Sequence, residues 1–113
     1  MNKIYKVSQI PKDLPKPVID RFKEDINDMD CWYGSDRNID SEGGFFYVIQ
    51  NEKDYESIPS VYCLGNKSII PEIVEVIDNS KYMRILVIIS LDYHIIYYVR
   101  EDLVPERVLE YMD

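Results

Sequence analysis

The chain lacks two common residue types and has very little of several others. Its 113 residues include no alanine, no threonine, one histidine, one tryptophan and two cysteines. Its apolar runs are no longer than five residues, as over 85–89, whereas a membrane-spanning helix needs about 20 apolar residues. No basic segment followed by an apolar one opens the sequence, so we expect no secretion signal and a cytoplasmic protein that does not bind membranes.

The residues that are present favour one folded domain. Apolar residues make up 46% of the chain, and glycine and proline number only four and six, which excludes the compositions of disordered and collagen-like chains. The length predicts a single domain over residues 1–113. Abundant isoleucine, tyrosine, lysine and asparagine beside missing alanine are typical of AT-rich coding, so we expect a bacterial or phage source. Nothing in the sequence explains the missing threonine.

Positive charge is scarce. Lysine and arginine number 13 against 21 aspartates and glutamates, which gives a net charge of −8. Nucleic-acid backbones and anionic membranes both bind basic side chains, so we expect this chain to bind neither directly. The excess lies mainly in residues 20–56, where eleven acids and four bases leave a net charge of −7. A partner attracted by this charge is expected to be basic.

The cysteines predict no metal centre. Cys31 and Cys63 form no C-x-x-C pair, and the single histidine, His94, is distant from both in the sequence, unlike the ligand spacing of a zinc site. A domain of this size builds a core without a disulfide. We therefore expect two reduced cysteines and no cofactor, with a disulfide as the alternative.

The N-terminal half contains one clear amphipathic helix. Apolar residues spaced by three and four from Val18 to Met29 predict a helix over 17–29, with a proline in its first turn. The other elements expected in this half are an edge strand within 1–10, a polar loop over 30–44, a strand over 45–50, a short helix capped by Asn51 and ending at Ile58, and a strand over 61–64.

The C-terminal half predicts a β-hairpin. Residues 84–91 and 94–100 are rich in aliphatic and aromatic side chains and are separated by a short gap near Asp92, which is typical of two antiparallel strands. In the register that we expect, partner numbers sum to 185, so that Arg84 lies opposite Glu101 and the pair is favourable in charge.

Two further helices are expected around this hairpin. The spacing of Ile73, Val74 and Ile77 favours a helix over 71–78, although the β-branched content of this segment is typical of a strand. A closing helix is expected to start at Asp102 or Val104 and to end at Tyr111. The apolar residues of this helix that are expected to face inward are Val104, Val108 and Leu109.

Together these elements predict an α+β fold. We expect one domain with a mainly antiparallel sheet centred on the 84–100 hairpin, packed against two to four helices, including those at 17–29 and 103–112.

Catalytic chemistry has little support in the sequence. His94 is the one side chain of the type that changes charge near neutral pH, and no serine lies in a G-x-S-x-G elbow. We therefore predict no catalytic residue and no enzyme. A small enzyme that uses His94 together with Asp92 remains an alternative.

A metal or small-ligand site in the 36–42 loop is a second alternative. Asp36, Asn38 and Asp40 match the first three ligand positions of a calcium loop. The match then fails, because Ser41 replaces the turn glycine and a tyrosine stands where the bidentate glutamate is required. We predict no metal ligand, and a calcium-responsive regulatory domain stays open.

The segment from Asp25 to Glu42 is the leading candidate for a binding surface. It combines six acids with Trp32 and Tyr33, and these two aromatic types are preferred interface anchors. Carboxylates around them would attract a basic partner. The alternative is that Trp32 is core and the acids are solvated. The predicted partner-binding residues are Asp28, Asp30, Trp32, Tyr33, Asp36, Asp40 and Glu42.

These observations predict a protein that works by binding. The function that we expect is that of a small acidic inhibitor, similar in kind to an immunity protein or an antitoxin. It would neutralise a basic protein such as a nuclease toxin by steric and electrostatic occlusion.

Overall fold

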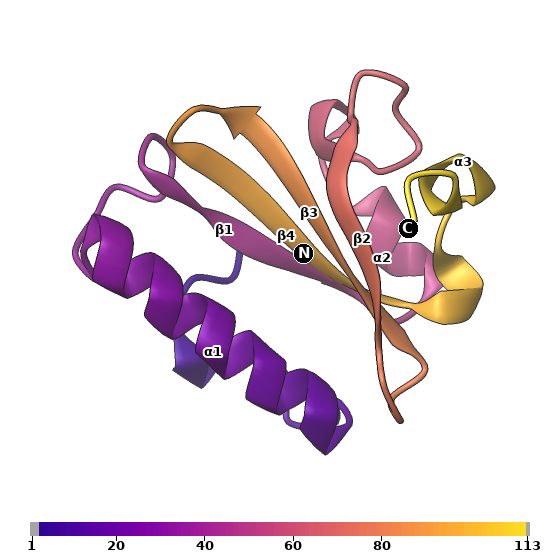
Figure 1. Cartoon of the computed structure of the whole chain (residues 1–113), viewed down its shortest axis with the longest axis horizontal. Helices are drawn as coiled ribbons and strands as arrows, with labels where there is room; N and C mark the ends of the chain where they lie inside the picture. The colour runs from indigo at the N-terminus through magenta and orange to yellow at the C-terminus, as the bar shows by residue number, and fades with distance from the viewer. Residues whose placement is uncertain (1–2, 113) are drawn as a thin grey trace.

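A four-stranded sheet lies at the centre of the protein in a computed structural model, which describes residues 3–112 (Figure 1). Its order is β1-β4-β3-β2. β1 pairs with β4 in parallel, and the other two pairings are antiparallel, so the α+β prediction is confirmed. The strand bounds are β1 Gly43–Ile49, β2 Pro71–Ile77, β3 Tyr82–Ser90 and β4 Tyr93–Arg100.

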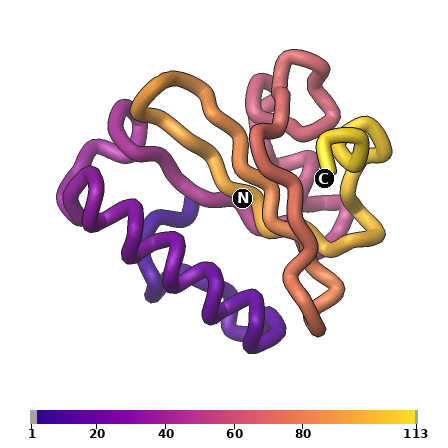
Figure 2. The backbone as a smooth tube through the Cα atoms, in the orientation of Figure 1, coloured from indigo at the N-terminus to yellow at the C-terminus, as the bar shows by residue number. Residues whose placement is uncertain are grey.

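Helices cover both faces of the sheet. The long helix α1 (Lys16–Tyr33) packs on one face, whereas α2 (Glu52–Glu56) and α3 (Glu106–Leu109) lie on the other (Figures 1 and 2). Three short 3-10 turns complete the described chain: η1 Val7–Gln9, η2 Ser60–Tyr62 and η3 Glu101–Leu103. Apolar side chains therefore form two core clusters, one on each face.

The predicted amphipathic helix is confirmed and is longer than expected. Its buried apolar residues run from Val18 to Met29 as predicted, but the helix continues to Tyr33. Gly34 ends it, with a φ of 90° and an N–H that donates to the carbonyl of Asp30. A positive φ of this kind favours glycine. The polar loop predicted over 30–44 is thereby shortened to residues 34–42.

The helix expected over 71–78 is wrong, because this segment is strand β2. It pairs antiparallel with β3, and the turn that connects the two strands contains Asn79 and Lys81, both with positive φ. β-branched side chains pack well on a pleated surface and are restricted in a helix. The spacing of Ile73, Val74 and Ile77 agrees with a helix by coincidence, and the β-branched content was the better indicator.

The β3–β4 hairpin is confirmed, but its predicted register is wrong. The residue numbers of paired residues sum to 182 along most of the ladder rather than to 185, so Arg84 lies opposite Tyr98 and not Glu101. An irregularity between Ile88 and Ser90 shifts the pairing beside the turn. Because the shift is odd, it exchanges the two faces of β4 relative to β3, and it places Tyr98 on the α1 side with Arg84.

Three smaller expectations need correction. Residues 3–10 form a single bridge, between Ile4 and Phe46, and then the turn η1, not the strand expected within 1–10. Met1 and Asn2 lie outside the described residues. Residues 61–64 fall in η2 and the turn after it. The closing helix is divided into η3 and α3 by Pro105, and Leu109 is exposed rather than inward. Proline restricts the residue before it to extended backbone, which interrupts the helix.

Candidate functional site

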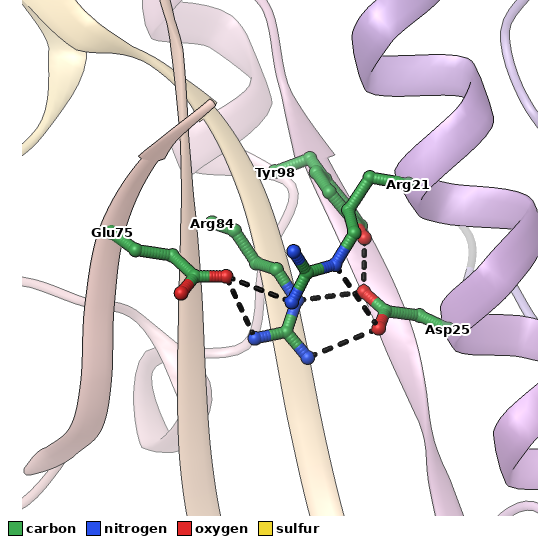
Figure 3. Close-up of polar contacts among 5 residues, drawn as sticks. All are labelled: Arg21, Asp25, Glu75, Arg84 and Tyr98. Atoms are coloured by element: carbon green, nitrogen blue, oxygen red, sulfur yellow. Dashed lines mark hydrogen bonds and ion pairs between the residues drawn. The ribbon is translucent and has the colours of Figure 1, made fainter. Parts of the chain in front are cut away.

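A buried polar network joins α1 to the sheet (Figure 3). Arg84 of β3 donates from Nε and Nη2 to the carboxylate of Asp25, at 2.7 and 3.1 Å, and from Nη1 to Glu75 of β2 at 3.3 Å. The Tyr98 hydroxyl donates to Asp25 as well. Arg21 lies 2.9 Å from Glu75 and 3.7 Å from Asp25. Two cations and two anions thus balance one another between the helix and two strands, and Tyr98 joins them from β4.

This network corrects one expectation about the acidic segment. Asp25 was counted among the surface carboxylates, but it is buried and its charge is neutralised by Arg84. Burial lowers the pKa of Arg84, yet hydrogen bonding and the charge of Asp25 outweigh it, so the net pKa is raised. Burial and the neighbouring carboxylate both raise the pKa of Tyr98. At neutral pH the tyrosine is a neutral donor and the arginine is a cation.

A cleft of about 360 Å³ opens beside the network. Asp25 and Arg84 line it together with apolar side chains of α1, β3 and β4. The Tyr33 ring lies near its end, with its centroid 6.3 Å from that of His94. The remaining lining residues are Asp28, Met29, Trp32, Leu86, His94 and Ile96.

Trp32 lies at this cleft, and most of its side chain is exposed to solvent. Its side chain is 82% exposed although it also lines the cleft. It occupies the last turn of α1, where Met29 takes the inward position. Burial of a tryptophan is strongly favourable, and in this protein most of the Trp32 side chain stays in contact with solvent.

The predicted acids divide into paired and free groups. Asp30 pairs with Arg37 at 2.5 Å, and Asp40 pairs with Lys3 at 2.8 Å. Within residues 3–112, the carboxylates of Asp28, Asp36 and Glu42 have no hydrogen bond and no ion pair.

Arg37 organises the loop that carries several of these acids. Its side chain is buried and donates to Asp30, to the carbonyl of Gly34 and to the carbonyl of Gly44. The guanidinium therefore holds the 34–42 loop against the end of α1 and the start of β1. This role of Arg37 was not predicted from the sequence, although a lone base in an acidic loop is a usable signal for an internal ion pair.

The loop does not have the arrangement of a calcium site. The Asn38 side-chain oxygen accepts from the backbone N–H of Asp40, and the Asp40 carboxylate faces Lys3. Across residues 3–112, no group of three or more His, Cys, Asp or Glu side chains is placed to hold a metal ion. Cys31 and Cys63 are both free thiols.

The β3–β4 turn extends the surface at this end of the sheet. The Gly43 N–H donates to the carbonyl of Asp92, and the Tyr93 hydroxyl donates to the carbonyl of Ile39, so the turn and the 34–42 loop lie together. Figure 2 shows this loop running from the end of α1 to the same end of the sheet. Leu91 in the turn is 89% exposed and Ile88 on β3 is also exposed.

His94 lines the cleft and has a polar contact with the backbone. Its Nδ1 lies 3.2 Å from the carbonyl oxygen of Gly43, and its side chain is partly buried. Asp92 is exposed in the turn, and within residues 3–112 no hydrogen bond or ion pair joins it to His94. Leu86, His94 and Ile96 line the same cleft as the predicted Trp32 and Tyr33, and the sequence did not indicate that they come together.

Comparison with known proteins assigns no family. No protein-family model matches the chain, and neither the curated proteins nor the solved structures contain a significant match. Over residues 3–112, no helix combines the length and the apolar character that a bilayer crossing requires.

Proposed function

We propose that this protein acts by binding a basic protein, as a small acidic inhibitor of the immunity-protein or antitoxin kind. The single observation that carries the proposal is the 82% exposure of Trp32 at the mouth of a cleft. It favours the interface interpretation of the Trp32 region over the core interpretation. Buried tryptophans are frequent hot spots in protein complexes.

Charge around Trp32 supports a basic partner. The free carboxylates of Asp28, Asp36 and Glu42 lie on α1 and on the loop that follows it, while Leu91 adds exposed apolar area at the same end of the sheet. Apolar anchors inside a ring of one charge sign give both contact area and selectivity. A nuclease that binds phosphate with basic side chains would offer the complementary surface.

The mechanism is occlusion with electrostatic steering. The acidic end of the protein attracts the basic surface, which raises the association rate, and Trp32 is then buried against it. The partner's active surface is covered without any covalent step. Salt screens the first part of this process much more than the second.

The experiment uses the basic protein encoded by a neighbouring reading frame as the candidate partner. Association and dissociation rates are measured at low and at high salt. We expect the association rate to fall at least about tenfold as salt rises, and an association rate that does not change with salt would refute steering.

Three variants locate the surface. Trp32→Ala should weaken binding by more than about tenfold, mainly through faster dissociation. Asp36→Asn removes one free carboxylate of the 34–42 loop and should slow association. Glu56→Gln on α2 removes one exposed charge on the other side of the sheet and serves as the control. If Glu56→Gln slows association as much as Asp36→Asn does, the proposed surface is wrong.

A further inference from the structure

The cleft beside Trp32 has the chemistry of a receptor for a single cationic side chain. Two aromatic rings, those of Trp32 and Tyr33, line it, and Met29, Leu86 and Ile96 supply apolar walls. Asp28 is the one lining acid whose carboxylate has no partner within residues 3–112, because Asp25 is occupied by Arg84 and Tyr98. We propose that this cleft binds an arginine side chain of the basic partner.

Three properties favour arginine over other occupants. Its planar guanidinium stacks on an indole face, which a lysine ammonium does less well. It pairs with a single carboxylate through two hydrogen bonds, as Asp28 at the cleft offers. The volume of about 360 Å³ lies at the small end of ligand pockets, so the cleft fits a side chain better than a nucleotide-sized ligand.

The charges already in the cleft do not oppose a cation. Arg84 lines it, but this guanidinium donates to both Asp25 and Glu75, and Arg21 also contacts these two acids. The charges of these two arginines and two acids cancel, so the carboxylate of Asp28 is the uncompensated charge at the cleft. An anionic ligand would meet this uncompensated carboxylate and would find Arg84 already occupied.

The test uses the intact chain and a short peptide as the probe. Trp32 is the only tryptophan, so its indole N–H gives one NMR resonance that reports on the cleft alone. An acetylated, amidated Gly-Arg-Gly peptide should shift this resonance saturably, with a dissociation constant on the order of 1–10 mM. The same peptide with citrulline, which keeps the shape and removes the charge, should bind at least about tenfold more weakly.

Matched variants complete the experiment. Asp28→Asn changes an exposed side chain and should weaken peptide binding about two- to fivefold without disturbing the rest of the spectrum. Glu56→Gln, which removes an exposed carboxylate on the other side of the sheet, should leave the affinity unchanged. The inference is overturned if the shift does not saturate, if citrulline binds as well as arginine, or if Asp28→Asn has no effect.

The inference rests on the proposed function for the source of the arginine, and the two fail in different ways. Saturable binding of the arginine peptide without any salt-dependent protein complex would refute the proposed function and keep the cleft assignment. A salt-dependent complex that neither Asp28→Asn nor excess arginine peptide weakens would refute the cleft assignment alone.

Discussion

Replacement of Asp25 by asparagine is the sharpest test of how α1 is held on the sheet. Asn keeps the size of the side chain and removes its charge, so Arg84 would stay buried without its main counterion. Removal of one member of a buried pair costs about 3–5 kcal/mol. Because Glu75 still lies 3.3 Å from Arg84, we expect the low end, about 3 kcal/mol, out of a total stability of about 5–15 kcal/mol.

The loss is measured by urea unfolding followed by circular dichroism. Fluorescence is a poor probe, because Trp32 is already exposed in the folded protein. A change of about 3 kcal/mol corresponds to a melting temperature lower by roughly 10–20 °C in a domain of this size. The control is Asp20→Asn on the same helix, whose carboxylate makes an exposed pair with Lys16 and should cost less than about 1 kcal/mol.

A double variant separates charge from packing. Asp25→Leu with Arg84→Met removes both charges and retains apolar volume, so it should be more stable than Asp25→Asn alone. Its remaining defect is the Tyr98 hydroxyl without an acceptor, at about 1–3 kcal/mol. If Asp25→Asn costs no more than Asp20→Asn, the buried pair does not hold the helix and the reasoning is refuted.

The remaining predictions concern the start of β1, alkaline pH and the cap of α2. Gly44→Ala should prevent stable folding, because a Cβ at φ 121° would lie 1.7 Å from the carbonyl oxygen of His94; a soluble variant with wild-type thermal unfolding would contradict this. Burial raises the pKa of Tyr93 from 10.0 to about 12, so the unfolded chain loses this proton first, and the stabilisation present below pH 10 should be lost as pH rises toward 12. The loss of stability between pH 10 and pH 12 should therefore be smaller in Tyr93→Phe than in the wild type, and an equal loss in both proteins would exclude this coupling. Asn51→Ala removes the side-chain oxygen that accepts from the Asp54 N–H and should cost about 0.5–2 kcal/mol in urea unfolding, and an unchanged midpoint would show that the cap is dispensable.

The network also explains how the candidate site is presented. Asp25 and Arg21 lie on the side of α1 that faces β2 and β3. Their pairing with Arg84 and Glu75, together with the buried apolar stripe of the helix, fixes its rotation. That rotation brings Trp32, seven residues after Asp25, to the cleft mouth. Loss of the network should therefore disturb the proposed binding surface as well as stability.

Local pattern was enough for much of the fold. Periods of three and four placed α1, aromatic and β-branched runs placed β1, β3 and β4, and Asn51 marked the start of α2. These signals are carried by residues close in sequence, where one face must be apolar and one polar. The concentration of acids between residues 20 and 56 also follows from the sequence alone, and so does the expectation of a basic partner.

Tertiary contacts decided what short-range patterns leave ambiguous. β2 is a strand because β3 offers it a partner. The observed hairpin register places Tyr98 opposite Arg84, where the Tyr98 hydroxyl reaches Asp25. Whether each carboxylate is buried and paired or exposed and free was likewise not visible in the sequence, since its partner lies on another element. Asp25 is neutralised in the interior, whereas Asp28, one turn later on the same helix, is exposed. Composition thus determined that the protein is acidic, and the packing of α1 on the sheet decided which of its acids remain free beside an exposed tryptophan, because burial and ion pairing depend on neighbours that only the folded chain brings together.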